Sequence, residues 1–181
     1  LQLCGGVAVP HQRDAVSAPL EYFCDVRPLW SELLVFALKS KAPRLAQWLD
    51  KVVQAHAANH PELLELKKAF QEVRLDMEPH LMNEENILFP AMLNMAEGKA
   101  ASGCFGSVRA PIRVMERDHD NIGALLAKIK KITNNYAPPQ DACNTYRALL
   151  EGLKQFEEDT HLHVHKENSI LFPLAIEVEN I

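Results

Sequence analysis

One stretch of the sequence occurs twice and decides the fold. It reads HLMNEENILFP at residues 80–90 and HVHKENSILFP at residues 163–173. Both copies share the pattern His-x-x-x-Glu-x-x-Ile-Leu-Phe-Pro, in which an imidazole precedes a carboxylate by four residues. On an α-helix this spacing puts the two side chains on one face, one turn apart, where both can reach a single metal centre. Two such faces turned toward each other predict a cage for two metal ions.

Apolar residues around both copies recur at alternating spacings of three and four, the period of an amphipathic helix. Four such stripes run along the chain: Val35, Leu38, Ala42, Leu45, Leu49, Val52 and His56; Val73, Met77, His80, Glu84, Ile87 and Ala91; Ile112, Met115, His119, Ile122, Leu126 and Ile129; Leu149, Leu153, Phe156, Thr160, His163, Glu167, Ile170 and Leu174.

Three breaks separate these helical segments. They fall at residues 59–61, where Pro61 is well placed to open a helix, at the glycine-containing stretch 98–106, and at residues 137–141. No alternating strand pattern competes. The sequence therefore predicts an all-α protein, an antiparallel four-helix bundle with short connections over residues 20–181. Residues 1–19, with Pro10 and Pro19, are expected to form an N-terminal arm.

Composition excludes several classes of function. A chain of 181 residues with 48% hydrophobic content can bury one substantial core. Its net charge of -5, without a cluster of Lys and Arg, excludes a nucleic-acid partner. The longest apolar run, residues 33–38, is far shorter than the roughly 20 residues that a membrane span needs. The four cysteines are widely spaced and form no Cys-x-x-Cys, which argues against both a zinc ribbon and a disulfide scaffold. A reducing cytoplasm is therefore the expected compartment.

Five side chains on the apolar stripes carry the candidate chemistry: His80, Glu84, His119, His163 and Glu167. Ionised carboxylates in a bundle core are unfavourable without a counter-charge, and the stripes contain no Lys or Arg. Taken alone, His119 would be a hydrogen-bonded core histidine, and either glutamate could be solvated at a bundle edge. Together they favour a metal site.

The other histidines lack this placement. His161 and His165 point roughly 100° per residue away from His163, which favours a solvated or outer role. At the rise of an α-helix, His56 lies about 30 Å along the bundle from the level expected for His80, His119 and His163. It is therefore not expected to be a ligand. Mixed imidazole and carboxylate ligands suit iron, manganese or zinc, and carboxylates able to bridge two ions inside a bundle favour non-haem di-iron. The Ile-Leu-Phe-Pro segments are interpreted as core packing followed by a helix kink or stop.

At these residues the sequence resembles the hemerythrin-like (HHE) family, most closely its di-iron branch called repair of iron centres. The resemblance covers about residues 43–176. It is carried by the two repeated stretches, by Val-Met-Glu-Arg-Asp-His-Asp at residues 114–120 and by Thr-Asn-Asn-Tyr-Ala-Pro-Pro at residues 133–139. In that family each of the four helices donates a histidine and two glutamates bridge the irons. The resemblance thus implies that His80, His119 and His163 are terminal ligands and that Glu84 and Glu167 are the bridges.

The N-terminal part departs from the family pattern. The helix-1 histidine is expected at Val35, and no histidine occurs between His11 and His56. Glu32, one turn earlier, is either a substitute ligand or a surface glutamate, and water is a third alternative. The family also has an N-terminal domain with a Cys-Cys-Gly-Gly motif, of which residues 4–6, Cys-Gly-Gly, are the remnant here.

The resemblance implies a cytoplasmic protein that donates iron to iron-sulfur clusters damaged by nitric oxide or peroxide, more an iron donor than a turnover enzyme. Damaged iron-sulfur proteins would then be its partners. Two alternatives stay open. One is a carrier or sensor that binds oxygen or nitric oxide at an open iron position. The other is a degenerate bundle that acts as an interaction module through the apolar residues 29–38, which suit either the contact of a homodimer or a deeply buried helix.

Overall fold

The computed structural model describes residues 36–96, 99 and 106–180 of the chain. Its elements, in chain order, are α2 (Phe36–His56), α3 (Glu62–Asn83), the π-helical turn η2 (Glu84–Leu88), α4 (Phe89–Ala96), α5 (Arg109–Ile132), α6 (Asn144–Lys166), the π-helical turn η3 (Glu167–Leu171) and α7 (Phe172–Glu179). The described residues form no strand, and the predicted all-α four-helix bundle is confirmed.

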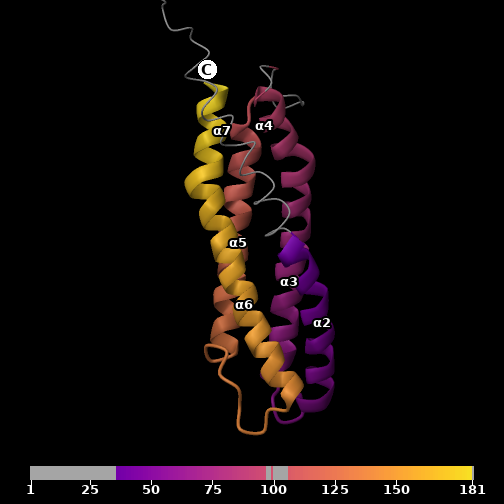
Figure 1. Ribbon diagram of the computed structural model, residues 1–181. Helices are drawn as coiled ribbons and strands as arrows, with labels where there is room; N and C mark the ends of the chain where they lie inside the picture. The colour runs from indigo at the N-terminus through magenta and orange to yellow at the C-terminus, as the bar shows by residue number, and fades with distance from the viewer. Residues whose placement is uncertain (1–35, 97–98, 100–105, 181) are drawn as a thin grey trace, which may run out of the picture.

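Three long rods form the upper part of the bundle in Figure 1. One consists of α3, η2 and α4, a second is α5, and the third consists of α6, η3 and α7. The fourth helix, α2, packs against α3 and α6 along the lower part only. The predicted breaks at residues 59–61 and 137–141 are confirmed as the connections at the lower end. The expected arm at residues 1–19, and Glu32 and Val35, lie outside the described residues.

The core divides into two apolar clusters along the bundle. The lower cluster is built from residues such as Leu45, Val73 and Phe156, and the ring of Phe156 meets that of Phe70 edge-on with 5.8 Å between centroids. The upper cluster includes Leu88 and Met115. On each long rod the predicted ligands fall between the two clusters, so a polar layer interrupts an otherwise apolar interior. No helix among the described residues is long and apolar enough to cross a membrane.

The stripes are confirmed up to the glutamates and at Ala91, whereas the isoleucine position after each glutamate shifts by one residue. The sequence predicts Ile87 and Ile170 on the core face, but both are only half-buried, whereas Leu88 and Leu171 are buried. A π-helical turn takes more residues than an α-helical turn, so each π turn advances the pattern. Of the two outcomes expected after Ile-Leu-Phe-Pro, a helix kink or a helix stop, the stop does not occur, because the rods continue as α4 and α7.

The end of α7 caps the start of α5. The Val108 backbone N–H donates to Glu179 Oε1 at 2.6 Å, and the Ser107 hydroxyl donates to Glu179 Oε2 at 3.0 Å. A carboxylate at a helix N-terminus satisfies free N–H groups and complements the helix dipole. We expect Glu179→Ala to lower the free energy of unfolding by about 1 kcal/mol, a fall in Tm of about 2–4 °C in thermal unfolding.

The matched control is Glu177→Ala, which removes an exposed carboxylate from the same helix without disturbing the cap. It should change Tm by much less. Equal losses in the two variants would show that the capping contacts contribute nothing particular.

Candidate metal centre

The structure brings all five predicted ligands into one buried layer. His80 lies near the end of α3, His119 lies in the middle of α5, and His163 lies near the end of α6. Glu84 and Glu167 are the first residues of η2 and η3. The exposed fractions of these residues are 1% for His80, 0% for Glu84, 5% for His119, 4% for His163 and 1% for Glu167. These polar groups are therefore as inaccessible as the apolar core around them.

Glu84 lies between two imidazoles from different rods. Its Oε1 is 2.8 Å from Nε2 of His80 and 3.1 Å from Nε2 of His163. The ligand atoms of His80, Glu84, His163 and Glu167 all lie within 4.8 Å of one another, a grouping that can hold a metal ion. The His-x-x-x-Glu pairs of the two copies thus meet across the bundle in one cluster.

Glu167 is in turn approached by all three rings. Its Oε2 lies 2.9 Å from Nε2 of His119, 3.5 Å from Nε2 of His163 and 3.8 Å from Nε2 of His80. The Nε2 atoms of His119 and His80 are 3.2 Å apart. Each ring therefore presents the same nitrogen to the centre of the cluster.

The two π turns have a physical origin in the prolines that follow them. Pro90 and Pro173 have no backbone N–H, and a proline ring clashes with the carbonyl of the residue four positions earlier in a regular α-helix. A wider turn before each proline accommodates the ring, and π turns occur frequently at functional sites. Each wide turn begins at a carboxylate of the cluster. The Ile-Leu-Phe-Pro segments, for which the sequence predicts core packing followed by a helix kink or stop, thus adjoin the site and set its local geometry.

The chemistry of the cluster fits a bound cation. Glu84 Oε2, Glu167 Oε2 and His80 Nδ1 are buried polar atoms that make no hydrogen bond. Glu167 Oε2 accepts none even though His119 Nε2 lies only 2.9 Å away. Buried carboxylate oxygens without donors are costly, and no Lys or Arg among the described residues pairs with either glutamate of the cluster. Buried oxygens and nitrogens that converge in this way, several of them without a hydrogen bond, are arranged as metal ligands are.

Without a metal ion, protons on the imidazoles supply part of the positive charge that the buried carboxylates need. Burial disfavours a charged ring, but the carboxylates of Glu167 and Glu84 outweigh it and raise the pKa of His80 to about 10. Burial also opposes protonation of His163, yet Glu84 and then Glu167 raise the pKa of that ring. Burial would raise the pKa of Glu167, but its contacts with His119 and His80 lower it to about 2. In the metal-free cluster a protonated His80 and an ionised Glu167 therefore stabilise each other.

The structure adds contacts around the ligands that the sequence analysis missed. The Oδ1 atom of Asn168 lies 3.1 Å from Nδ1 of His119, and the Oδ2 atom of Asp118 lies 3.5 Å from Nδ1 of His80. Asn168 and Asp118 are adjacent in sequence to Glu167 and His119, and this adjacency was the only available signal. A hydrogen bond of the kind that Asn168 makes can orient a metal-binding imidazole.

A further buried carboxylate, Glu157, was also missed. It is 5% exposed and lies 3.3 Å from Nζ of Lys130, away from the imidazoles of the cluster. Because Glu157 has a cationic partner, it does not need a metal ion.

The remaining described histidines lie away from the cluster. His161 and His165 are exposed, as expected for residues off the stripe. The ring of His56 lies beside that of Tyr146 at the lower end of the bundle, with 5.4 Å between centroids and 50° between planes. His60 lies there too, 2.9 Å from Glu62 and 3.0 Å from Asp141. His11 lies outside the described residues.

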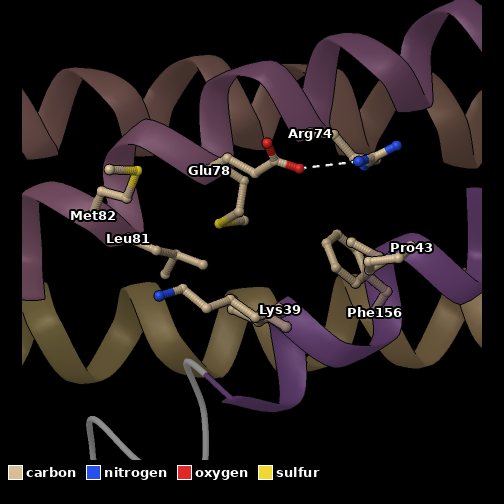
Figure 2. A pocket seen from close by; sticks show the side chains of 10 residues that line it. Lys39, Pro43, Arg74, Glu78, Leu81, Met82 and Phe156 are labelled. Carbon is tan, nitrogen blue, oxygen red and sulfur yellow. Dashed lines mark hydrogen bonds and ion pairs between the residues drawn. The ribbon is translucent and has the colours of Figure 1, made fainter.

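An apolar cavity of about 320 Å³ lies beside the site, between α2 and α3. Figure 2 shows Leu81 and Met82 at one end and Pro43 and Phe156 at the other, with the Arg74 to Glu78 ion pair of 3.0 Å along its edge. Its full lining is Leu38, Lys39, Ala42, Pro43, Arg74, Met77, Glu78, Leu81, Met82 and Phe156. None of the five candidate ligands faces it, so the cavity is separate from the polar layer.

Comparison with known proteins agrees with this geometry. The family model described as the hemerythrin HHE cation binding domain matches residues 40–175. The iron-sulfur cluster repair protein YtfE of Musicola paradisiaca is 35% identical over 170 residues, which cover 94% of this chain and 72% of that protein. The YtfE proteins of Yersinia pseudotuberculosis and Dickeya chrysanthemi are 36% and 37% identical over 141 residues, 78% of this chain and 60% of each relative. The chain thus spans between three fifths and three quarters of their length, and it belongs to the hemerythrin HHE cation binding family.

Proposed function

We propose that this protein is a cytoplasmic non-haem di-iron protein that supplies iron for the repair of iron-sulfur clusters damaged by nitrosative or oxidative stress. The observation that carries the proposal is the buried layer of three imidazoles and two carboxylates between two apolar clusters. Family membership and this cluster together indicate iron binding. The names of the relatives, iron-sulfur cluster repair proteins, favour repair over the oxygen or nitric oxide carrier.

Each residue has a distinct part in this proposal. His80, His119 and His163 present Nε2 and would act as neutral terminal ligands. Glu84 and Glu167 each lie near more than one ring and would bridge two cations. Iron bound there would supply the positive charge that the buried carboxylates need, and ferrous iron is also the cargo. The apolar clusters above and below exclude water from the layer.

The ligand set also supports release of the cargo. Five side chains among the described residues converge on the layer, and none of them is a thiolate. Two octahedral ions need more donors than five side chains provide, and a site without soft thiolates holds ferrous iron weakly compared with an iron-sulfur cluster. A weakly held ion can pass to a stronger acceptor.

The test measures iron content and then iron transfer. Protein purified without added iron should contain about two irons per chain by elemental analysis. The loaded protein is then mixed anaerobically with an iron-sulfur enzyme whose cluster has been damaged by peroxide, together with sulfide and thiol. Enzyme activity and cluster absorbance should recover, and recovery should persist with a weak ferrous chelator that suppresses recovery by free iron.

Two results would overturn the proposal. Protein with no bound iron would point to the degenerate bundle. If the fully loaded protein supports no more recovery than the same concentration of ferrous salt, the repair function is excluded, although the iron site stands.

A further inference from the structure

The ring of His119 is held from both sides. Its Nε2 faces the cluster, 2.9 Å from Glu167 Oε2, and its Nδ1 lies 3.1 Å from the Oδ1 atom of Asn168. Asn168 follows Glu167 directly in η3, so one wide turn of the third rod supplies both contacts. The ring of Phe172 stacks on the same imidazole, with 5.8 Å between centroids and 6° between planes.

A neutral imidazole has one N–H, and the nitrogen without the proton is the one that can bind a cation. An amide oxygen beside Nδ1 accepts a hydrogen bond and so favours the form in which Nδ1 carries the proton. We infer that Asn168 is a positioning residue that keeps the Nε2 lone pair of His119 directed at the metal centre. This inference rests on the proposed metal site and adds to it a residue that controls how tightly one ligand binds.

The rest of the site shows that this contact is particular to the second copy of the repeat. In the first copy the residue after the glutamate is Glu85, which lies 2.6 Å from Lys39 of α2 and meets no imidazole. The Nδ1 atom of His80 makes no hydrogen bond, and its nearest carboxylate oxygen, on Asp118, is 3.5 Å away. Of these two rings, only that of His119 has its orientation fixed by a hydrogen bond at Nδ1.

The test compares three variants of the full chain, using Zn²⁺ alone as the probe. Asn168→Leu keeps the side-chain size but has no acceptor, whereas Asn168→Asp keeps an oxygen in the same place. Ser169→Ala is the matched control, because its hydroxyl lies 3.3 Å from Nδ1 of the exposed His165. By competition with a chromophoric chelator, Asn168→Leu should bind Zn²⁺ about 10–100-fold more weakly than the wild type. Asn168→Asp should restore most of the affinity, and Ser169→Ala should leave it unchanged.

Nitrogen NMR of the zinc-loaded protein gives a readout that a merely structural role would not move. The wild type should show His119 bound through Nε2, with a slowly exchanging proton on Nδ1. Asn168→Leu should lose the slow exchange while its helical content and the Tm of its metal-free form stay unchanged.

Binding of Zn²⁺ through Nδ1 of His119 would overturn the inference, and so would wild-type affinity in Asn168→Leu. A wild type that binds no cation would overturn both this inference and the proposed function. If the affinity and NMR results are as expected but iron transfer fails, the inference stands without the repair function.

Discussion

Glu167→Ala should lose most of its iron and remain helical. The carboxylate of Glu167 lies within 3.8 Å of Nε2 on all three rings, so it is the anion most widely shared in the cluster. Its removal takes away one of the two proposed bridges and half of the buried negative charge that would attract cations. We expect iron per chain to fall from about two to less than about one on purification without added iron. Elemental analysis and circular dichroism of the same sample measure both outcomes.

The matched control is Glu157→Ala, which removes another buried glutamate from the same rod. Glu157 is 5% exposed and lies beside Lys130, away from the imidazoles. This variant should unfold more easily, because it removes a buried side chain and its contact with Lys130, but it should keep its iron, because the cluster stays intact. Full iron in Glu167→Ala, or equal iron loss in both variants, would falsify the assignment of Glu167 as a bridge.

Most of the fold and the cluster could be predicted because the helices keep a regular α-helical period up to the two glutamates. The stripe from Ile112 to Ile129 on α5 is buried at every predicted position. Up to Glu84 and Glu167 the other two rods follow the same period. A hydrophobic period fixes which face of a helix is buried, and a repeated His-x-x-x-Glu on that face brings ligands together across the bundle.

The rest of the site could not be predicted, since it depends on local departures from that period and on contacts between rods. A π turn adds a residue, so a template of 3.6 residues per turn places Ile87 and Ile170 on the core face in place of Leu88 and Leu171. The contact between Asn168 and His119 depends on the rotation and spacing of two rods. No pattern within either segment specifies those quantities.

Iron affinity should fall steeply as the pH falls, because protons and metal ions compete for the same rings. The pKa of His80 is raised to about 10, so its ring holds a proton at neutral pH in the metal-free protein, and the same carboxylates also raise the pKa of His163. Glu167, with a pKa of about 2, is already ionised. A metal ion that displaces two protons loses up to about 100-fold in affinity per pH unit. Calorimetry in buffers of different ionisation enthalpy counts the protons released.

The stability of the metal-free protein should respond to pH in the opposite direction. A raised pKa means that the folded state holds the proton more tightly than the unfolded state. The contribution of His80 to stability is therefore fully present below about pH 6.5 and is lost as the pH rises through about 10. Glu167→Gln should lower the pKa of His80 in NMR titrations, because the contact with Glu167 is the largest single cause that raises it. If His80 of the metal-free wild type titrates near 6.5, or if iron affinity is independent of pH, proton competition does not govern this site.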